Sequence, residues 1–301
     1  MRIATWIVNS LRARLPKVEW WLDRAAPDVL LLQETKLADG DAPLVPFRMA
    51  GYELLHHGEG RWNGVAIAVR AGIAVEEVVA NFDGSPVRDS TAGSPGAGEE
   101  DFDPFSEARM LSAICGGIRV ASVYAPNGRA LETPFYEGKL RWFARLRAWL
   151  VEARDPGEAL VVGGDFNVAP ADADVWDAAA VHGGTHVSGP ERAAFAALLD
   201  WGLEDAYRAH HAEPDRFSWW DYRAGNFHKN LGMRIDHLLV SRSVAERVAW
   251  AEIDREARKG KDPVPSDHAP VVMDLDAPGR PIDAGWAGAM ERIAARSRKG
   301  T

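Results

Sequence analysis

The feature that most constrains this chain is a series of short apolar runs that each end in a polar side chain. Asn9 follows TWIV, Glu34 follows VLLLQ, and Asp165 follows LVVGG. Runs of this length and composition are typical of buried strands. Because strands of one packed sheet system deliver their ends to a common edge, we expect these residues to meet in one oxygen-rich pocket with an imidazole. The other members of the set are Tyr124 after RVASV, Asn167, Asp236 within MRIDHLLV, and Asp267 with His268 ahead of APVVMDL.

These strand-like runs alternate with helical segments along the chain. β-branched alternation predicts the strands, and apolar spacing with proline near the first turn predicts the helices. The two halves have a similar make-up and no linker divides them, which predicts one domain with two packed sheets and helices outside. We expect strands at 3–8, 28–33, 63–69, 110–124 (a hairpin), 159–163, 234–241 and 269–275, and helices at 16–25, 135–153, 191–201 and 287–296.

Composition divides the chain into a domain, which contains one distinct loop, and a C-terminal tail. Residues 1–276 carry the alternating pattern and are predicted to be the single domain. Within them, residues 81–103 are rich in Gly, Ser, Pro and acidic residues and show no period, which predicts a mobile surface loop. Residues 277–301 form a partly helical C-terminal tail that ends in basic residues.

Several protein classes are excluded by composition. Of the 301 residues, 47% are hydrophobic, which rules out wholesale disorder, and no apolar run approaches the ~18 residues of a membrane helix. The N-terminus has Arg12 and Arg14 where a secretory signal would have its apolar core. Cys115 is the only cysteine, which excludes an internal disulfide framework. We therefore expect a cytoplasmic protein with no membrane association.

The formal net charge of −9 argues against a general polyanion binder, because phosphate backbones are held by Lys and Arg. Local clustering matters more than the sum, and a cation site itself requires carboxylates. If the partner is a nucleic acid, basic residues should gather on the pocket face. The candidates are Arg12, Arg14, Arg61, Arg129, Arg223, Lys229 and Arg234.

The acidic members of the strand-end set are ligands of the kind that Mg²⁺ or Mn²⁺ prefers. They are Glu34, Asp165, Asp236 and Asp267. Magnesium usually takes one or two carboxylates together with waters and a substrate phosphate, so not all four need touch the metal. Clustered carboxylates repel one another, and a bound cation removes that conflict and polarises a phosphoryl oxygen.

Each of these residues also has an ordinary structural explanation. A Glu after an apolar strand is usually a solvated loop residue, and the segment 165–167 after two glycines has the composition of a turn. The segment 266–268 has the composition of a helix cap or a strand entry. The conjunction favours function, because independent turns have no reason to place a ligand-grade residue at every strand end.

The motifs together resemble the exodeoxyribonuclease III family of abasic-site DNA endonucleases, within the wider endonuclease/exonuclease/phosphatase fold. The matching stretches are IATWIVNSLRAR, PDVLLLQETK, VASVYAPNG, VVGGDFNVAP, RFSWWDYR, GMRIDHLLVS and PSDHAPVVMDL. They occur in the family's order, and the ordered set is far more specific than any one of them. The resemblance implies an α+β fold, a four-layer αββα sandwich of two packed mixed sheets, with one site for Mg²⁺-dependent phosphodiester hydrolysis.

The resemblance also implies roles for the strand-end residues. Asp165 would activate the attacking water, Asn167 would help to hold it, and Tyr124 would contact the phosphate. His268 would contact the scissile phosphate, with Asp236 as its hydrogen-bonded orienter. Glu34 would be the main metal carboxylate and Asp267 a second one, and the metal-side set would be completed by Asn9, Asp165 and Asn167.

The implied substrate is double-stranded DNA with abasic sites or 3′ ends, bound by a monomer. Asn127 and Arg12 would contact the DNA. An apolar pocket for the base-free sugar is matched by Trp219, Met233 and Ile235. The expected activities are incision 5′ to abasic sites and removal of nucleotides or blocking groups from 3′ ends.

One departure from the family pattern concerns Ile7. The family reads W-N-x-N where this chain reads Trp6-Ile7-Val8-Asn9, so an asparagine that helps bind the metal and phosphate network is replaced by a side chain without a hydrogen-bonding group. Loss of one preorganised donor costs roughly 10²–10³ in rate. Two alternatives therefore stand beside the nuclease: a lesion-binding protein with feeble catalysis, and a phosphatase or phospholipase of the same fold.

Overall fold

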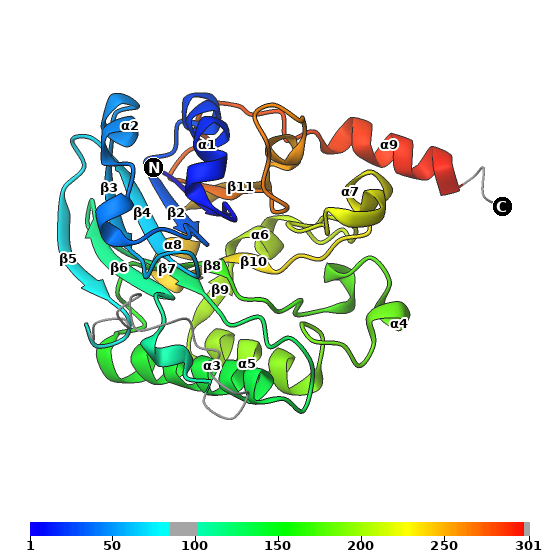
Figure 1. The fold of residues 1–301 in the computed structure, drawn as a ribbon, viewed down its shortest axis with the longest axis horizontal. Coiled ribbons are helices and arrows are strands. Elements are labelled where there is room, and N and C mark those ends of the chain that lie inside the picture. Colours follow the sequence, from blue (N-terminus) through cyan, green and yellow to red (C-terminus); the bar gives the residue numbers. More distant parts are fainter. Residues whose placement is uncertain (85–101, 298–301) are drawn as a thin grey trace.

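The computed structural model describes residues 1–84 and 102–297. Two six-stranded sheets face each other and helices cover the outer face of each, so that the molecule has four layers (Figure 1). The predicted α+β, αββα architecture is therefore confirmed. Of the predicted loop at 81–103, residues 85–101 lie outside the described part of the chain.

The first sheet consists of β1 (Arg2–Ile7), β2 (Val29–Gln33), β3 (Tyr52–His57), β4 (Val65–Arg70), β11 (Val248–Ile253) and β12 (Val271–Leu275). Their order across the sheet is β11-β12-β1-β2-β4-β3. β1 runs parallel to β2 and antiparallel to β12. The carboxyl ends of β1 and β2 and the amino end of β12 therefore lie at one edge of this sheet.

The second sheet consists of β5 (Val75–Ala80), β6 (Met110–Cys115), β7 (Ile118–Tyr124), β8 (Leu160–Asp165), β9 (Leu203–Asp205) and β10 (Asp236–Ser241). Their order is β5-β6-β7-β8-β10-β9. In the register of the sheet, Asp165 pairs with Tyr124 on one side and with Asp236 on the other. Three predicted site residues thus stand in one row across neighbouring strands.

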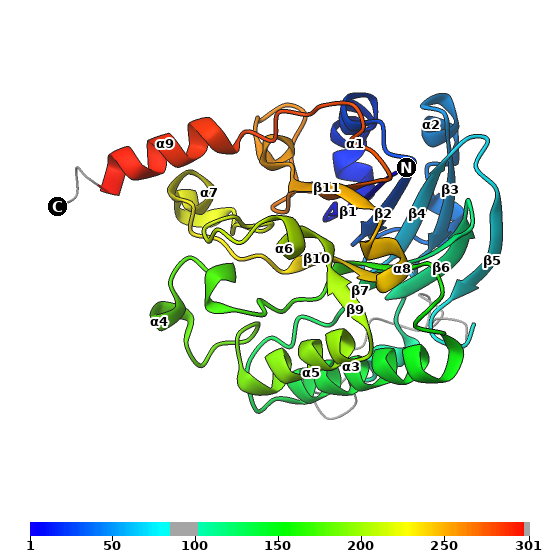
Figure 2. The same ribbon diagram turned by 180° about the vertical axis from the view of Figure 1, so that it is seen from behind.

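The helices form the two outer layers and the connections. The longer ones are α1 (Leu11–Ala25), α3 (Pro134–Ala153), α5 (Gly189–Asp200) and α9 (Trp286–Ser297). Figure 2 shows α3 and α5 side by side under the second sheet, and α9 projecting from the body. The shorter helices are α2 (Leu44–Met49), α4 (Ala178–Val181), α6 (Ala206–His210), α7 (Asn226–Lys229) and α8 (Arg242–Ala245), with 3₁₀ turns η1 (Asp39–Asp41), η3 (Pro104–Ser106), η4 (Asp172–Asp174), η5 (Arg223–Gly225) and η6 (Arg255–Arg258).

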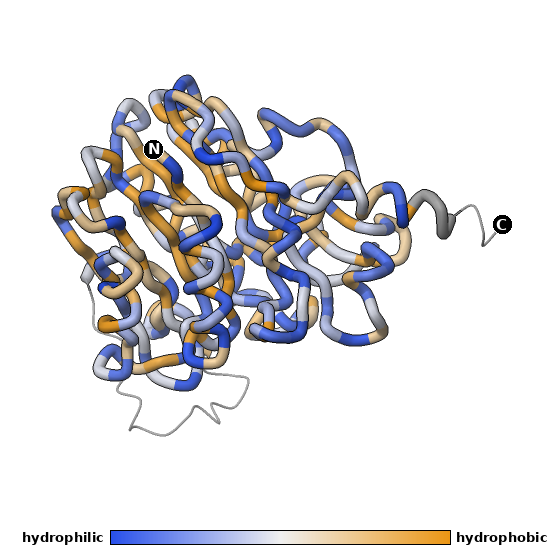
Figure 3. Tube along the Cα trace, turned by 90° about the horizontal axis from the view of Figure 1, so that it is seen from above, coloured by the Kyte–Doolittle hydropathy of each residue, from blue (hydrophilic) through white to orange (hydrophobic). Residues whose placement is uncertain are grey.

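Three large apolar cores among the described residues hold the four layers together: one lies between the sheets and one lies on the outer face of each sheet. Hydrophobic residues run along the strands that contribute to these cores (Figure 3). Ile3, Leu31 and Val161 belong to the core between the sheets. Trp21 of α1 packs in the core on the outer face of the first sheet, and Trp142 of α3 packs in the one on the second. Burial of such side chains from water is the main force that joins the layers.

Within the described part of the chain, the predicted strands correspond to the eight inner strands, and the four edge strands were not predicted. β3 and β11 are the edges of the first sheet, and β5 and β9 are the edges of the second. Edge strands carry polar and charged side chains on exposed positions, as the sequence VEEVVA of β5 illustrates. Their apolar pattern is correspondingly weak.

Side-chain hydrogen bonds lie at the starts of the first and the last predicted helix. The first helix begins at Leu11 and not at Pro16, because the Ser10 hydroxyl accepts a hydrogen bond from the Ala13 amide at 3.4 Å and caps it there. In the tail helix α9, the Trp286 side chain is buried and donates to the Ile253 carbonyl at 2.7 Å. No helix among the described residues is long and apolar enough to cross a membrane.

Arg234 was predicted to lie on the pocket face, and this is wrong. Its guanidinium is buried and donates to Asp174 Oδ1 at 2.7 Å and to Asp205 Oδ2 at 2.6 Å. Burial alone would raise the pKa of Asp205, but Arg234 outweighs burial and holds that pKa far below its ordinary value. Arg234 is therefore an internal counter-ion that ties β10 to β9 and η4.

We predict that Arg234→Met lowers the free energy of unfolding by about 3–5 kcal/mol, because it leaves the buried Asp205 without its guanidinium partner and leaves Asp174 paired with Arg208 alone. Urea denaturation followed by tryptophan fluorescence measures this change. Arg242→Met is the control, since Arg242 pairs with Glu246 on the surface and its loss should cost under about 0.5 kcal/mol. Equal stability of the two variants would contradict the assignment.

Candidate functional site

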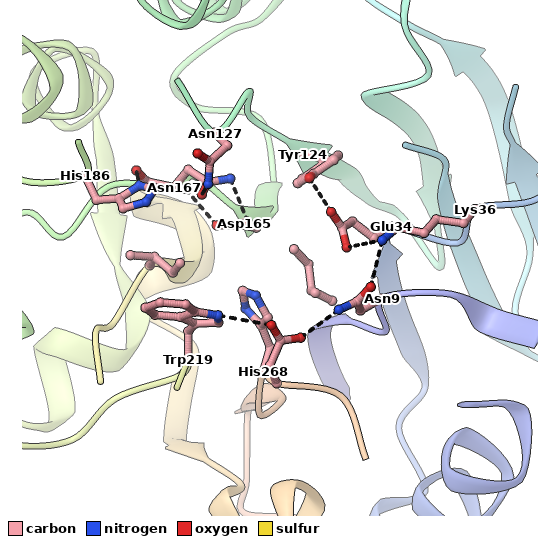
Figure 4. A pocket seen from close by; sticks show the side chains of 13 residues that line it. Asn9, Glu34, Lys36, Tyr124, Asn127, Asp165, Asn167, His186, Trp219 and His268 are labelled. Atoms are coloured by element: carbon pink, nitrogen blue, oxygen red, sulfur yellow. Dashed lines mark hydrogen bonds and ion pairs between the residues drawn. The ribbon is translucent and has the colours of Figure 1, made fainter. Parts of the chain in front are cut away.

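A cavity of about 270 Å³ opens where the ends of both sheets meet (Figure 4). The strand ends of both sheets contribute to it, so their predicted convergence is confirmed. Distant parts of the chain thus share one small, mostly polar space. The lining residues are Ile7, Asn9, Glu34, Lys36, Tyr124, Asn127, Asp165, Asn167, His186, Trp219, Ile235, Asp267 and His268.

A chain of hydrogen bonds and ion pairs runs along one wall of the cavity. Asp267 accepts from the Trp219 indole at 3.3 Å and from the Asn9 amide at 3.1 Å. The Lys36 ammonium donates to Asn9 Oδ1 at 2.7 Å and lies 3.3 Å from Glu34 Oε2. Glu34 Oε1 accepts a further hydrogen bond from the Tyr124 hydroxyl. Figure 4 shows this chain as connected dashed lines.

The opposite wall is built around Asp165 and Asn167. Asp165 is buried and accepts from the Asn167 backbone amide at 2.7 Å and from its side-chain amide at 2.8 Å. Asn127 donates to the Asn167 side-chain oxygen at 3.2 Å. The carboxylate and the amides are therefore locked together by a continuous set of hydrogen bonds, which preorganises this wall.

His268 and Asp236 form a buried pair at the base of the cavity. Their Nδ1 and Oδ2 atoms are 2.8 Å apart. Burial alone would lower the pKa of His268, but the Asp236 carboxylate outweighs burial and raises it to about 10. The ring is consequently an imidazolium at neutral pH, with its Nδ1–H directed at Asp236. A fixed positive charge among the carboxylates of the cavity can pair with one anionic group of a ligand.

The buried acidic groups beside this pair titrate unusually. The pKa of Asp165 is raised well above its ordinary value, first because the carboxyl is buried and then because Asp236 lies nearby. Burial, followed by the Glu34 carboxylate, raises the pKa of the Tyr124 phenol. A carboxylate with a raised pKa is a stronger base, and like charges held together create demand for a cation.

Backbone strain concentrates at the cavity. Left-handed φ angles, which side-chain-bearing residues rarely adopt, recur among its lining residues. Each costs on the order of 1–2 kcal/mol and persists only where the surroundings enforce it. The residues are Asn9 (47°), Glu34 (53°), Lys36 (52°), Asn167 (52°) and His186 (76°).

Not all of the predicted site residues line the cavity. Most of them line the cavity, and Asp236 lies directly behind it in contact with His268. Met233 does not line the cavity and packs in a small apolar cluster with Trp219 and Ile235. Arg12 is also outside the lining, and its exposed guanidinium lies 3.6 Å from Asp41.

Two lining residues, Lys36 and His186, were missed by the sequence analysis. Lys36 stands two positions after Glu34 in QETK, and that closeness was the available signal. His186 lies in an irregular segment far from any strand end, and its Nδ1 lies 2.6 Å from the Asn167 carbonyl. Burial lowers the pKa of His186 to about 4, so its ring is neutral.

The residues that face a prospective metal are hard oxygen donors, namely Glu34, Asp267 and the amide oxygen of Asn9. Among residues 1–84 and 102–297, no group of three His, Cys, Asp or Glu side chains is arranged to hold a metal ion. Magnesium needs only one or two carboxylates and completes its shell with water and phosphate oxygens. The donor set therefore suits magnesium better than a metal that requires a closed protein cage.

Comparison with known proteins identifies the family. Residues 5–268 match the Endonuclease/Exonuclease/phosphatase family. The chain belongs to this family. Within it, the chain is 32% identical to exodeoxyribonuclease III of Haemophilus influenzae over 283 residues, covering 90% of this chain and 98% of that protein. These matches make this family member a phosphodiesterase nuclease of the exodeoxyribonuclease III type.

Two solved structures agree with this assignment. A 3′ phosphatase from Neisseria bound to a product DNA hairpin has a TM-score of 0.79 and 38% identity, covering 92% of this chain and 99% of that one. An AP endonuclease from Archaeoglobus fulgidus has a TM-score of 0.81 and 32% identity, with the same coverage of 92% and 99%. The likeness therefore extends over nearly the whole nuclease.

We predict that Asp236→Asn lowers the pKa of His268 from about 10 toward the ordinary value of about 6.5, because burial remains and the opposing carboxylate is gone. NMR titration of the ring protons measures it in the protein without substrate. Asp276→Asn is the control, since that exposed carboxylate pairs with Arg247 at the other end of β12. An imidazolium that persists above pH 8 in Asp236→Asn would show that another group holds the charge.

Proposed function

We propose that this nuclease is a Mg²⁺-dependent DNA repair enzyme that incises 5′ to abasic sites and removes nucleotides or blocking groups from 3′ ends. The observation that carries the proposal is the buried His268–Asp236 pair, whose imidazole lines the same 270 Å³ cavity as the Asp165 carboxylate. A fixed cation beside a strong base suits the attack of water on a phosphodiester. The relatives named for AP endonuclease and 3′ phosphatase activity support both substrate types.

In this proposal the residues of each wall of the cavity have separate roles in the reaction. Asp165 accepts a proton from the attacking water, and Asn167 orients that water and the phosphate. His268 donates a hydrogen bond to a phosphate oxygen on which charge develops, with Asp236 keeping its ring protonated and oriented. Tyr124 and Asn127 contact the phosphate and the flanking DNA.

Magnesium would be held by Glu34, with Asp267 and Asn9 on the same wall. When bound, it would neutralise the crowded carboxylates and polarise the phosphoryl oxygen. The Lys36 ammonium already contacts Glu34 and Asn9, and these contacts support a preference of their oxygens for a cation. Trp219 and Ile235 offer an apolar surface to a sugar that lacks its base. Action as a monomer and a cytoplasmic location stay predictions.

We expect metal-dependent cleavage of two duplexes, one with an internal abasic analogue and one with a recessed 3′ phosphate, and no cleavage in EDTA. Asp165→Asn should lower kcat by about 10³-fold or more, because the base is lost, while the Kd for DNA changes less than about threefold. Gel assays of product and fluorescence anisotropy of binding measure the two effects. Asp276→Asn should match the wild type.

Three outcomes would redirect the proposal. Retained turnover in Asp165→Asn would reassign the base. Hydrolysis of inositol phosphates or sphingomyelin in place of DNA would favour the phosphatase or phospholipase alternative. Cleavage of only one duplex would limit the enzyme to that class of lesion.

The Ile7 side chain is buried, and it lines the cavity beside Asn9 and Glu34. This observation supports a second candidate, a lesion-binding protein with feeble catalysis, because an alkyl group occupies a position where a hydrogen-bond donor would assist. The two candidates differ in turnover and not in DNA affinity.

We predict that Ile7→Asn raises kcat by roughly 10²–10³-fold, which is the usual worth of one preorganised donor. Single-turnover kinetics on the abasic duplex measure the chemical step directly. Ile7→Val is the matched control, because it alters the volume without adding a polar group, and it should leave kcat within about threefold. An unchanged rate in Ile7→Asn, with efficient wild-type turnover, would remove the lesion-binding candidate.

A further inference from the structure

A buried ion pair stands behind the Asp165 wall of the cavity and has no role in the scheme above. Lys139 of α3 and Glu191 of α5 are both completely buried, and the Lys139 ammonium donates to Glu191 Oε1. Burial alone would raise the pKa of Glu191, but Lys139 and the surrounding hydrogen bonds outweigh burial and lower it. The carboxylate is therefore ionised, although neither residue lines the cavity.

The Lys139 ammonium reaches the backbone of two segments that carry cavity side chains. It donates to the Asn167 carbonyl at 2.6 Å and lies 3.4 Å from the Asn127 carbonyl. These two residues are joined through their side chains at 3.2 Å, and Asn167 in turn holds Asp165. The Lys139 ammonium thus contacts the backbone of both segments that carry the side chains of this wall.

The Glu191 carboxylate holds the third segment of the same wall. Its Oε1 accepts from the Thr185 hydroxyl at 2.9 Å and from the His186 amide at 3.0 Å, and its Oε2 accepts from the Ser188 amide at 3.1 Å. The His186 ring also contacts the Asn167 carbonyl, and the Thr185 hydroxyl lies 3.2 Å from the Asn127 carbonyl. The ion pair and its partners therefore form one closed network.

We infer that Lys139 and Glu191 are positioning residues for phosphodiester hydrolysis: their ion pair sets the relative placement of Asn127, Asn167 and His186 on one wall of the cavity. Stability alone is a weak reason for such a pair, because uncharged replacements of buried ion pairs are often neutral or stabilising. Directional bonds to two carbonyls and two backbone amides instead specify geometry. Misplacement of a catalytic wall by about 1 Å can cost about 10²-fold in rate.

The test is the double variant Lys139→Met with Glu191→Gln. It removes both charges together, so that neither is left buried alone, and Gln keeps one acceptor oxygen, which suits the capping box with Ser188. What it loses is the ammonium that joins the Asn127 and Asn167 carbonyls, and the second carboxylate oxygen that accepts from Thr185 and His186. We expect kcat to fall about 10- to 100-fold and KM to change less than about threefold, because neither residue touches the substrate.

A second buried ion pair provides the matched control. Arg2 and Asp274 are joined at 2.7 Å at the end of β1 opposite to the cavity, and neither residue lines the cavity. Arg2→Met with Asp274→Asn should lower the thermal midpoint and leave kcat unchanged at a temperature at which the fold is intact. A purely structural role for Lys139 and Glu191 would make the two double variants alike in kcat.

A spectroscopic measurement tests the geometry without substrate. In the wild type, the His186 Nδ1–H donates to a carbonyl that Lys139 also contacts, so the ¹⁵N spectrum should show a single Nδ1-protonated form. In the double variant we expect exchange between tautomers. A kcat within twofold of wild type together with an unchanged His186 spectrum would overturn the inference.

If the double variant does not fold, Thr185→Val replaces it, since Thr185 is half-buried and its hydroxyl lies within hydrogen-bond distance of both Glu191 and the Asn127 carbonyl and can donate to either. An expected threefold or greater loss of kcat supports the inference, and an unchanged kcat overturns it. The inference rests on the proposed site. If the wild type cleaves no DNA, the proposed function fails, while the His186 spectra still decide the positioning role.

Discussion

The structure depends on how closely its two sheets approach at β8. A Cβ atom at Gly163 would lie 2.7 Å from side-chain atoms of Leu31 and Leu238, and one at Gly164 would overlap the Val123 carbonyl. Only glycine fits both places, because side-chain-bearing residues never approach so closely. Gly163 lets β8 lie against Leu31 of the first sheet, Gly164 lets it lie close to β7 in its own sheet, and Asp165 follows them at the end of the strand. The shared edge of the two sheets is where the cavity opens.

Carboxylates that gather at that edge repel one another, and most of them are paired with a cationic side chain. Asp236 is neutralised by His268, Glu34 by Lys36, and behind the wall Glu191 by Lys139. Burial, followed by the nearby Asp236 carboxylate, raises the pKa of Asp165 well above its ordinary value. A central carboxylate with a raised pKa is suited to accept a proton from water. The same crowding of carboxylates supports the proposal of a magnesium ion beside it.

Sequence patterns predicted the inner strands and the polar residues that follow them, because a strand buried on both faces has a clear apolar signature. The edge strands were missed, since half of each faces solvent. Lys36 could have been suspected from its closeness to Glu34. His186 and Lys139 could not, because nothing in an irregular segment or within a long amphipathic helix indicates a partner 19 or 28 residues away in the segment of Asn167.

Ordered motifs and strand-end positions are local properties of the chain, and they were sufficient to predict the family, the α+β architecture and most of the residues that line the cavity. What each charge contacts follows from the folded arrangement alone. Arg234, a candidate for the pocket face, is an internal counter-ion, and Met233 and Arg12 do not line the cavity. An ion pair joins α3 and α5 behind the Asp165 wall. Such outcomes depend on contacts between distant segments, and the free energy of a charge is set by those neighbours and by its burial.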